Sequence, residues 1–383
     1  MSITAAQGFR AAGVVAGLKT SGDRDVALVI NDGPSDVAAA VFTSNRVKAA
    51  PVLWSQQAVA DGRVRAVVLN SGGANACTGP DGFADTHATA EYVAKALDVS
   101  AADVAVCSTG LIGERLPMEK LLPGIDVAAV ALMPTGGADA AEAIRTTDTR
   151  AKQAAVHRDG WTVGGMAKGA GMLAPGLATM LCVITTDAAT DATTLDAALR
   201  DATRVSFDRV DSDGCMSTND TVIALASGAS TKTPNAAELT EALRAVCTDL
   251  AMQLLADAEG ATKEVEIEVV SAATEDDAVE VGRSIARNNL LKCALFGNDP
   301  NWGRVLSAIG TTNAAFDPDQ LAVEMNGVQI CRNGAAGDSR DLVDLTGRKI
   351  HIVVNLNAGE STATIWTNDL SHAYVEENSA YST

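Results

Sequence analysis

Aromatic residues and long apolar runs are both scarce in this chain of 383 residues. Phe, Trp and Tyr make up only 3% of the chain although 47% is hydrophobic, so the core must be built mainly from Ala, Val, Leu and Ile, which suits packed α/β layers. No segment approaches the roughly 18 uninterrupted apolar residues that a membrane span needs. The first residues lack the basic start and apolar run of a secretory signal. We therefore expect a cytoplasmic protein, long enough for two domains, with no membrane partner.

Basic residues are also few, since 29 Lys and Arg stand against 48 Asp and Glu, a formal net charge of −19. Nucleic acids and anionic membranes are bound through basic patches, so a nucleic-acid partner is not expected. The seven cysteines are scattered and form no Cys-x-x-Cys pair. This pattern predicts reduced, buried thiols rather than a disulfide framework.

The signatures of several common enzyme classes are absent or incomplete. Gly169-x-Gly171-x-x-Ala174 formally fits a dinucleotide-binding fingerprint, but Pro175-Gly176 interrupts it and a strand pattern follows where a helix is required. The four histidines are isolated, without His-Glu-x-x-His spacing, and no Gly-x-Ser-x-Gly elbow occurs. The sequence therefore favours neither a nucleotide enzyme nor a Ser–His–Asp triad, and no metal site is expected.

Short apolar runs alternate with helical patterns, which predicts mixed α/β structure. Strands are predicted at 26–31, 64–70 and 104–107, with a helical pattern around 84–97. Residues 235–257 form the clearest predicted helix, because their leucines and a valine recur at helical spacing and give one apolar stripe.

Near the C-terminus, two segments alternate apolar and polar residues and predict strands with one wet face, at 264–269 and 350–354. Residues 364–366 are predicted to be the hairpin mate of the second strand, across a turn at 357–359. The Ala- and Gly-rich stretch near 135–141 is predicted to be the softest point of the first half.

The most informative feature is a glycine-rich loop of small side chains that runs into Thr179, followed by an apolar run that predicts a buried strand. Thr179 is either an ordinary first residue of that strand or a nucleophile that becomes a chain N-terminus when the Ala178–Thr179 bond breaks. An N-terminal Thr carries its own base, because its free α-amine titrates near pH 8. The small residues Ala174, Gly176 and Ala178 leave the hydroxyl room to reach the preceding carbonyl. Local features alone leave both interpretations open.

Two further positions are candidates for chemistry. Thr109-Gly110 follows a predicted strand, and a hydroxyl beside a glycine N–H is a reasonable oxyanion hole, although such turns are common. Glu259 falls at the end of the predicted long helix, where the helix dipole disfavours a carboxylate. That mild conflict suggests a functional reason for Glu259.

A series of short motifs runs along nearly the whole chain: Val41 to Asn45, Asn70 to Gly79, Ser108 to Gly113, Thr146 to Thr149, Lys168 to Thr179, Ser217 to Thr221, Asp257 to Lys263, Gly297 to Arg304 and Glu377 to Thr383. In this order they resemble the ornithine acetyltransferase family, the bifunctional glutamate N-acetyltransferases of arginine biosynthesis, and the actinobacterial members most closely. The run Asp211 to Met216 and Asn298 depart from the family pattern. Neither departure touches the matched site residues.

The resemblance implies a layered α-β-β-α fold of the N-terminal-nucleophile type, similar to that of self-processing aminopeptidases. It implies cleavage between Ala178 and Thr179 into an α chain (1–178) and a β chain (179–383), which assemble as a heterotetramer of two α and two β chains. Thr179 would be the nucleophile, and Thr109 and Gly110 the oxyanion hole. The implied substrate-binding residues are Thr146, Lys168, Thr179, Glu259, Asn378 and Thr383.

The implied reaction carries an acetyl group from N-acetylornithine to glutamate through an ester on Thr179, giving ornithine and N-acetylglutamate. No resident cofactor is implied, and use of acetyl-CoA as a second acetyl donor is left open. Three alternatives remain at this stage. They are a self-processing aminopeptidase or amidase, a binding module on an inactive scaffold, and a paralogous acyltransferase for a related acyl amino acid.

Overall fold

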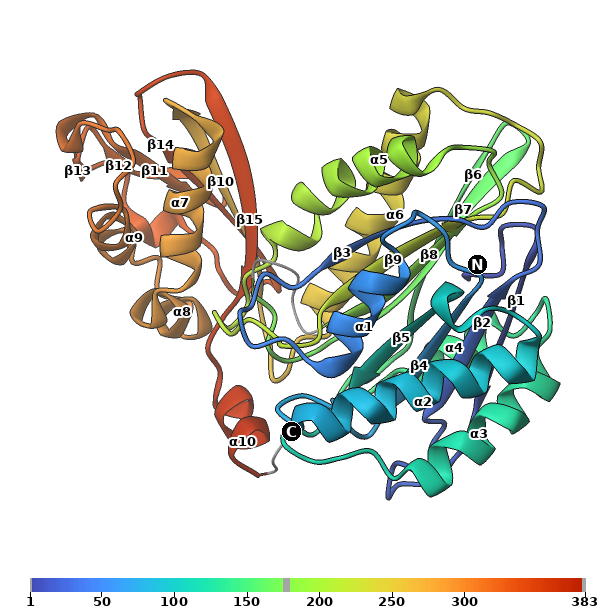
Figure 1. The fold of residues 1–383 in the computed structure, drawn as a ribbon. Coiled ribbons are helices and arrows are strands. Elements are labelled where there is room, and N and C mark those ends of the chain that lie inside the picture. Colours follow the sequence, from blue (N-terminus) through green and yellow to red (C-terminus); the bar gives the residue numbers. More distant parts are fainter. Residues whose placement is uncertain (1, 175–179, 381–383) are drawn as a thin grey trace.

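The computed structural model describes residues 2–174 and 180–380, and its main body is a stack of four layers (Figure 1). Two sheets lie face to face in the middle, and helices cover the outer face of each. A smaller lobe with its own sheet, residues 264–368, follows the stack and leads into the last helix, α10 (His372–Ala380). The predicted α-β-β-α fold is therefore confirmed.

The first sheet has four strands in the order β1-β2-β4-β5. Its strands are β1 (Phe9–Val14), β2 (Val26–Asn31), β4 (Ala66–Ser71) and β5 (Val104–Thr109), and its helices are α1 (Ala50–Ala58), α2 (Gly79–Leu97) and α3 (Met118–Ala131). Strands β4 and β5 run parallel, whereas the other pairs are antiparallel. Val68, Val106 and Leu121 are among the buried residues that join this sheet to its helices.

The second sheet has five strands in the order β3-β9-β8-β7-β6. Its strands are β3 (Val37–Phe42), β6 (Lys152–Arg158), β7 (Trp161–Lys168), β8 (Leu181–Thr186) and β9 (Thr221–Ala226), and its helices are α5 (Ala192–Arg204) and α6 (Ala236–Ala256). Helix α6 confirms the clearest prediction of the sequence. Asn235 and Glu238 form a capping box at its start, and its predicted apolar stripe is buried against the sheet.

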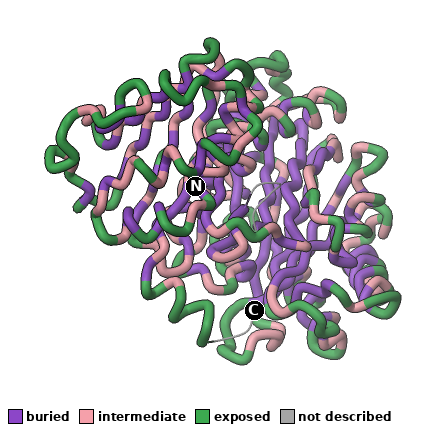
Figure 2. Tube along the Cα trace, turned by 90° about the vertical axis from the view of Figure 1, so that its left-hand side faces the viewer, coloured by how far each residue is buried: buried purple, intermediate pink, exposed green. Residues whose placement is uncertain are grey.

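The two sheets pack against each other through small and aliphatic side chains, including Val29 and Leu69 of the first sheet and Val183 and Ile223 of the second. Figure 2 shows that buried residues follow the strands while exposed residues gather in the loops. The small number of aromatic residues thus agrees with a core in which the two sheets pack through Ala, Val, Leu and Ile.

The predicted soft point near 135–141 is wrong, because it forms helix α4 (Gly137–Ala143), which packs on β1 and β2. Ala140 and Ala141 are fully buried. A Cβ placed on Gly13 of β1 would lie 1.9 Å from the carbonyl oxygen of Asp139. The small residues of this stretch therefore reflect close packing of a helix on a strand rather than flexibility.

The C-terminal lobe is built on a six-stranded sheet in the order β13-β12-β11-β14-β10-β15. Its strands are β10 (Glu264–Ala272), β11 (Ala322–Met325), β12 (Val328–Arg332), β13 (Ala335–Ala336), β14 (Lys349–Asn355) and β15 (Ser361–Asn368), and its helices are α7 (Glu275–Ala286), α8 (Asn289–Phe296) and α9 (Trp302–Ile309). The one-turn helices of the chain are Ala101–Asp103, Phe207–Arg209, Pro318–Gln320 and Arg340–Leu342.

The predicted hairpin between β14 and β15 is wrong, because β10 lies between them, parallel to β14 and antiparallel to β15. The N–H groups of Ala358 and Gly359 both donate to the carbonyl of Ser271 near the end of β10. The turn therefore passes over β10 instead of joining neighbouring strands.

The cysteines are only partly as predicted. All seven are free, and Cys107, Cys182, Cys247 and Cys331 are buried, but Cys77, Cys215 and Cys293 are exposed. Within residues 2–174 and 180–380, no helix combines the length and apolarity needed to cross a bilayer.

Candidate active site

A cavity of about 510 Å³ lies where the ends of β5 and β7 face helix α10 and the loop that follows α6. Six of the residues singled out in the sequence line it, although they come from distant parts of the chain: Thr109, Gly110, Thr146, Lys168, Glu259 and Asn378. Ala178, Thr179 and Thr383 lie outside the described residues, so their predicted roles stay predictions.

Thr109 ends β5, and Gly110 turns the chain away from it. The Thr109 carbonyl accepts hydrogen bonds from the N–H groups of Gly72 and Gly73, both at 3.0 Å. Gly110 has φ +127°, and a Cβ at that position would lie 2.6 Å from the Gly73 nitrogen. Only glycine fits this turn, which brings the Thr109 hydroxyl and the Gly110 backbone to the same cavity wall.

Lys168 ends β7 with its side chain buried. Its Nζ donates to Thr109 Oγ1 at 3.3 Å, which leaves the hydroxyl hydrogen of Thr109 free to point to another acceptor. Burial lowers the pKa of Lys168, and the charges of Asp148, Glu259 and Asp220 oppose that shift. The site thus holds a cation directly beside a hydroxyl donor.

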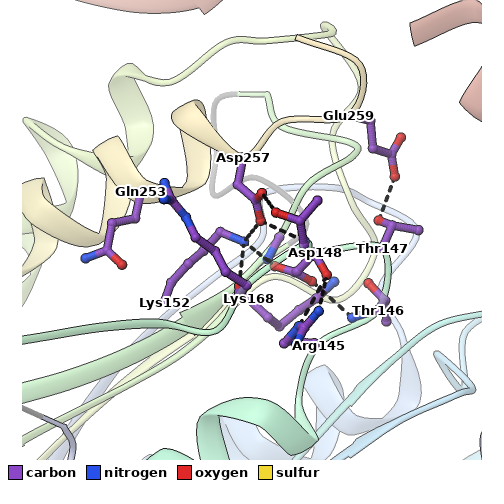
Figure 3. Close-up of polar contacts among 12 residues, drawn as sticks. Arg145, Thr146, Thr147, Asp148, Lys152, Lys168, Gln253, Asp257 and Glu259 are labelled. Atoms are coloured by element: carbon purple, nitrogen blue, oxygen red, sulfur yellow. Dashed lines mark hydrogen bonds and ion pairs between the residues drawn. The ribbon is translucent and has the colours of Figure 1, made fainter. Parts of the chain in front are cut away.

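A buried ion-pair network supports this end of the cavity (Figure 3). Asp148 Oδ1 accepts from Lys152 Nζ at 2.6 Å and from the Gly169 N–H at 2.7 Å. Asp148 Oδ2 accepts from the Thr146 N–H at 3.0 Å. Burial alone would raise the pKa of Asp148, but the ammonium groups of Lys168 and Lys152 outweigh it and lower the pKa to about 2. The Asp148 carboxylate therefore fixes the backbone at Thr146, which lines the cavity, and at Gly169, which follows Lys168.

The network continues to the end of α6. Lys152 Nζ also donates to Asp257 Oδ2 at 2.6 Å, and Asp257 accepts from the Thr149 N–H at 3.0 Å. Sequence reasoning assigned no role to Asp148, Lys152 or Asp257. Asp148 and Asp257 lie within two of the family motifs, but nothing in the sequence says that their side chains meet around Lys152.

Glu259 lies in the loop beyond α6, which ends at Ala256, so the predicted conflict with the helix dipole does not arise within the helix. Its N–H donates to the Ala170 carbonyl at 3.0 Å, and its Oε1 accepts from Thr147 Oγ1 at 2.7 Å. A Cβ on Gly171 would lie 2.7 Å from Glu259 Oε2. The glycine-rich loop therefore makes room for this carboxylate at the cavity wall.

Helix α10 brings Asn378 to the cavity together with Tyr374, which the sequence did not single out. The Tyr374 N–H donates to Ser371 Oγ at 3.0 Å, and Ser371 in turn donates to the Gly260 carbonyl. A Cβ on Gly260 would lie 2.1 Å from the Tyr374 nitrogen, so glycine permits the close contact of α10 with the loop. Burial raises the pKa of Tyr374 to about 12, so its hydroxyl is neutral near pH 7.

The cavity carries charges of both signs. Lys19 and Lys168 contribute cations, and Asp213 and Glu259 contribute carboxylates. Burial raises the pKa of Asp213. Opposite charges around one cavity suit a small zwitterionic ligand, such as an amino acid, better than an apolar one.

Comparison with known proteins identifies the family. A model described as the ArgJ family matches residues 10–383. The chain belongs to the ArgJ family. The "Arginine biosynthesis bifunctional protein ArgJ" of Streptomyces avermitilis is 69% identical over 382 residues, with 100% of both chains covered. The protein of the same name from Thermobifida fusca is 64% identical over 383 residues, again with 100% of both covered.

Two solved ArgJ-related structures also match. The ornithine acetyltransferase of Mycobacterium tuberculosis complexed with ornithine is 62% identical and covers 47% of this chain and 96% of that chain, with a TM-score of 0.45. The ArgJ protein of Bacillus halodurans is 34% identical and covers 51% of this chain and 97% of that chain, with a TM-score of 0.49. Each match spans about half of the present chain.

Membership of the ArgJ family confirms the resemblance seen in the sequence and the prediction of an acetyltransferase enzyme. It excludes the non-enzymatic binding module as the general description of the chain. The roles of individual residues rest on the geometry of the cavity.

Proposed function

We propose that this ArgJ-family enzyme transfers an acetyl group from N-acetylornithine to glutamate through an ester on Thr179. The observation that carries the proposal is the convergence of Thr109, Gly110, Lys168 and Glu259 on one cavity that bears both charges. The solved relative from M. tuberculosis was obtained with ornithine, which is the product of the first step proposed here.

In the first step the Thr179 hydroxyl oxygen adds to the acetyl carbonyl of N-acetylornithine, and its proton passes to the Thr179 α-amine. Thr109 Oγ1 and the Gly110 N–H donate to the oxygen as negative charge develops on it. The amide C–N bond then breaks, the ornithine amine takes the proton from the α-ammonium, and ornithine leaves an acetyl ester on Thr179.

In the second step the neutral amine of glutamate adds to the ester carbonyl. The ester C–O bond breaks, the proton lost by the amine returns to Thr179 Oγ, and N-acetylglutamate leaves. The two half-reactions share one cavity, so steady-state kinetics should be ping-pong. No resident cofactor takes part in either step.

Substrate binding follows from the charges around the cavity. Lys168 binds the α-carboxylate that both substrates share, and Glu259 binds the ammonium of the ornithine side chain. Thr146, Asn378 and Thr383 supply further polar contacts to the substrates.

The nucleophile arises by self-cleavage, in which the Thr179 hydroxyl attacks the Ala178 carbonyl and water then hydrolyses the resulting ester. The α chain (1–178) and β chain (179–383) would stay together because β7 and β8, on either side of the cut, are hydrogen-bonded neighbours in the second sheet. Met180, next to the new terminus, donates its N–H to the buried Asp220 at 3.0 Å. We propose a cytoplasmic heterotetramer of two α and two β chains.

The name of the curated relatives includes the word "bifunctional". We propose that acetyl-CoA can also acetylate Thr179, giving a second route to N-acetylglutamate. The principal rival is a hydrolase that hands the acyl group to water. Acceleration of ornithine release by glutamate would separate transfer from hydrolysis.

Denaturing intact-mass analysis before and after a brief exposure to N-acetylornithine tests the proposal. We expect two fragments that meet between Ala178 and Thr179, with one acetyl group added to the fragment that begins at Thr179. Thr179→Ala should abolish both the cut and the transfer. An uncut, unacetylated wild-type chain that still transfers acetyl groups would refute the scheme.

Removal of Ser382 and Thr383 tests the role of the tail separately. The truncated enzyme should show a raised KM for N-acetylornithine because the contacts of Thr383 with the substrate are lost. An unchanged KM would remove the tail from substrate binding.

A further inference from the structure

The two substrates of the proposed function make opposite demands on one cavity. N-acetylornithine carries an ammonium at the end of its side chain, whereas glutamate carries a carboxylate there. In a ping-pong reaction each occupies the cavity in turn. Lys168 is assigned to the α-carboxylate and Glu259 to the ornithine ammonium. The glutamate side chain therefore needs a different cation to bind its carboxylate.

Lys19 is a second cation that lines the cavity, and it comes from a different element than Lys168. It lies in the loop between β1 and β2, together with the lining residues Leu18, Thr20 and Ser21. Its side chain is half-buried, and its Nζ donates to the Arg24 carbonyl at 2.8 Å. An ammonium group has three donors, so this single carbonyl does not saturate it.

The backbone of this loop is firmly placed. Asp25 is fully buried, and its carboxylate accepts from the N–H groups of Ala16 at 2.6 Å, Leu18 at 2.5 Å and Lys19 at 3.1 Å. A buried carboxylate with three amide donors is a strong local anchor. Lys19 is therefore presented to the cavity from a fixed backbone, as a residue that recognises a ligand must be.

The electrostatics of the cavity point the same way. Burial lowers the pKa of Lys19, the nearby Asp25 and Asp23 raise it, and Arg145 and Lys168 lower it further. Lys19 and Lys168 line the same cavity and carry the same charge, so their ammonium groups repel each other. A ligand with two carboxylates relieves that repulsion, whereas a ligand with one carboxylate and an ammonium does so only in part.

We propose that Lys19 binds the side-chain carboxylate of the acceptor and so selects glutamate over its neutral analogue glutamine. This inference rests on the proposed function, because it assigns a residue to the second half-reaction. Lys168 is assigned to the α-carboxylate that both substrates share, and Glu259 to the ornithine side chain. Lys19 adds a residue that recognises the glutamate side chain.

The test compares glutamate and glutamine as acceptors, with N-acetylornithine as the donor, in the wild type, Lys19→Met and Lys19→Arg. The burst of ornithine counts active sites, so each rate is given per active site. In Lys19→Met, kcat/KM for glutamate should fall by about tenfold to a hundredfold, as expected for loss of a charged hydrogen bond. The rate with glutamine should change little, so the preference for glutamate collapses, and Lys19→Arg should restore most of it.

Lys120→Met is the matched control, because Lys120 Nζ donates to the Gly17 carbonyl of the same loop at 3.0 Å but Lys120 is exposed and outside the cavity lining. It should keep the wild-type preference. A Lys19→Met enzyme that still prefers glutamate, or a Lys120→Met enzyme that loses the preference as well, would overturn the assignment of Lys19. A wild-type enzyme that releases no ornithine from N-acetylornithine would instead overturn the proposed function and this inference with it.

Discussion

Lys168 Nζ lies 3.3 Å from Thr109 Oγ1, and this contact joins the ends of two strands that belong to different sheets. Thr109 ends β5 of the first sheet and Lys168 ends β7 of the second. The cavity is therefore formed where the two central layers of the stack meet. This arrangement explains why residues that are widely separated in sequence line one cavity.

The first prediction concerns the Thr109 hydroxyl. Thr109→Val keeps the shape of the side chain but removes the donor to the developing oxyanion, so kcat should fall by roughly 10²–10³. The steady-state rate of ornithine release at saturating substrate measures kcat. Thr109→Ser keeps the hydroxyl and should retain most of the activity. Equal losses in both variants would contradict this assignment, because Thr109→Ser keeps the hydroxyl that Thr109→Val removes.

The second prediction concerns the turn at Gly110. Gly110→Ala forces a side chain into a backbone with φ +127° and places its Cβ 2.6 Å from the Gly73 nitrogen. We expect the free energy of unfolding to fall by at least the roughly 1–2 kcal/mol that positive φ costs an L-residue. The melting temperature should fall with it, and activity should be lost.

Gly113→Ala separates the collision from the backbone strain. Gly113 also has positive φ, +89°, but a Cβ there meets nothing within 4 Å. Its melting temperature should fall less than that of Gly110→Ala, and its activity should be kept. Similar effects of the two substitutions would contradict the close approach of Gly110 to the Gly72–Gly73 turn.

The sequence predicts local elements of this protein better than their partners. Helix α6 and strand β10 follow from periodicity, because one buried face is enough to define each of them. Strand β2 follows from its short apolar run, since all six of its residues are buried. The β14–β15 hairpin was wrong because strand order depends on which strand fills the space between two others, and β10 is distant in sequence from both. The prediction of a soft point near 135–141 was wrong because small residues allow close packing as well as flexibility, and composition alone does not distinguish the two.

In the candidate site, too, sequence motifs identified single residues but not the contacts between distant ones. Thr109, Gly110, Lys168 and Glu259 were found through motifs and do meet at one cavity. The Lys152 ion pairs with Asp148 and Asp257 were not, because a buried charge network is a relation among three side chains that local sequence does not encode.

The third prediction follows from that network. Asp148→Asn removes a buried charge from between Lys152 and Lys168, and loss of one partner of a buried ion pair costs roughly 3–5 kcal/mol. The pKa of Asp148 is lowered in the folded protein to about 2, below its ordinary value of 3.8, so the stabilisation is present above about pH 4 and is lost as the pH falls towards 2.

Urea unfolding at several pH values measures this effect. The stability gap between the wild type and Asp148→Asn should be widest at neutral pH and should narrow between about pH 4 and pH 2. Asp32→Asn provides a comparison, because its ion pair with Arg10 is partly exposed and should contribute under 1 kcal/mol. A gap for Asp148→Asn that does not vary with pH would show that its hydrogen bonds, rather than its charge, stabilise the fold.

The fourth prediction concerns Glu259 and its opposite effects on the two substrates. Glu259→Gln keeps an oxygen that can accept from Thr147 Oγ1, now 2.7 Å from Glu259 Oε1, but removes the negative charge from the cavity wall. The KM for N-acetylornithine should rise by about tenfold to a hundredfold, because a charged hydrogen bond to its side-chain ammonium is lost. The KM for glutamate should stay the same or fall, since a carboxylate no longer faces another carboxylate.

Glu377→Gln is the matched control for Glu259→Gln. Glu377 is exposed, and it lines a second cavity that also borders Glu259, but it does not line the cavity that holds Lys168. It should leave both KM values near those of the wild type. Parallel increases in both KM values for Glu259→Gln would assign Glu259 to the structure of the cavity wall, whereas the divergent response would establish that it reads the charge of the donor side chain.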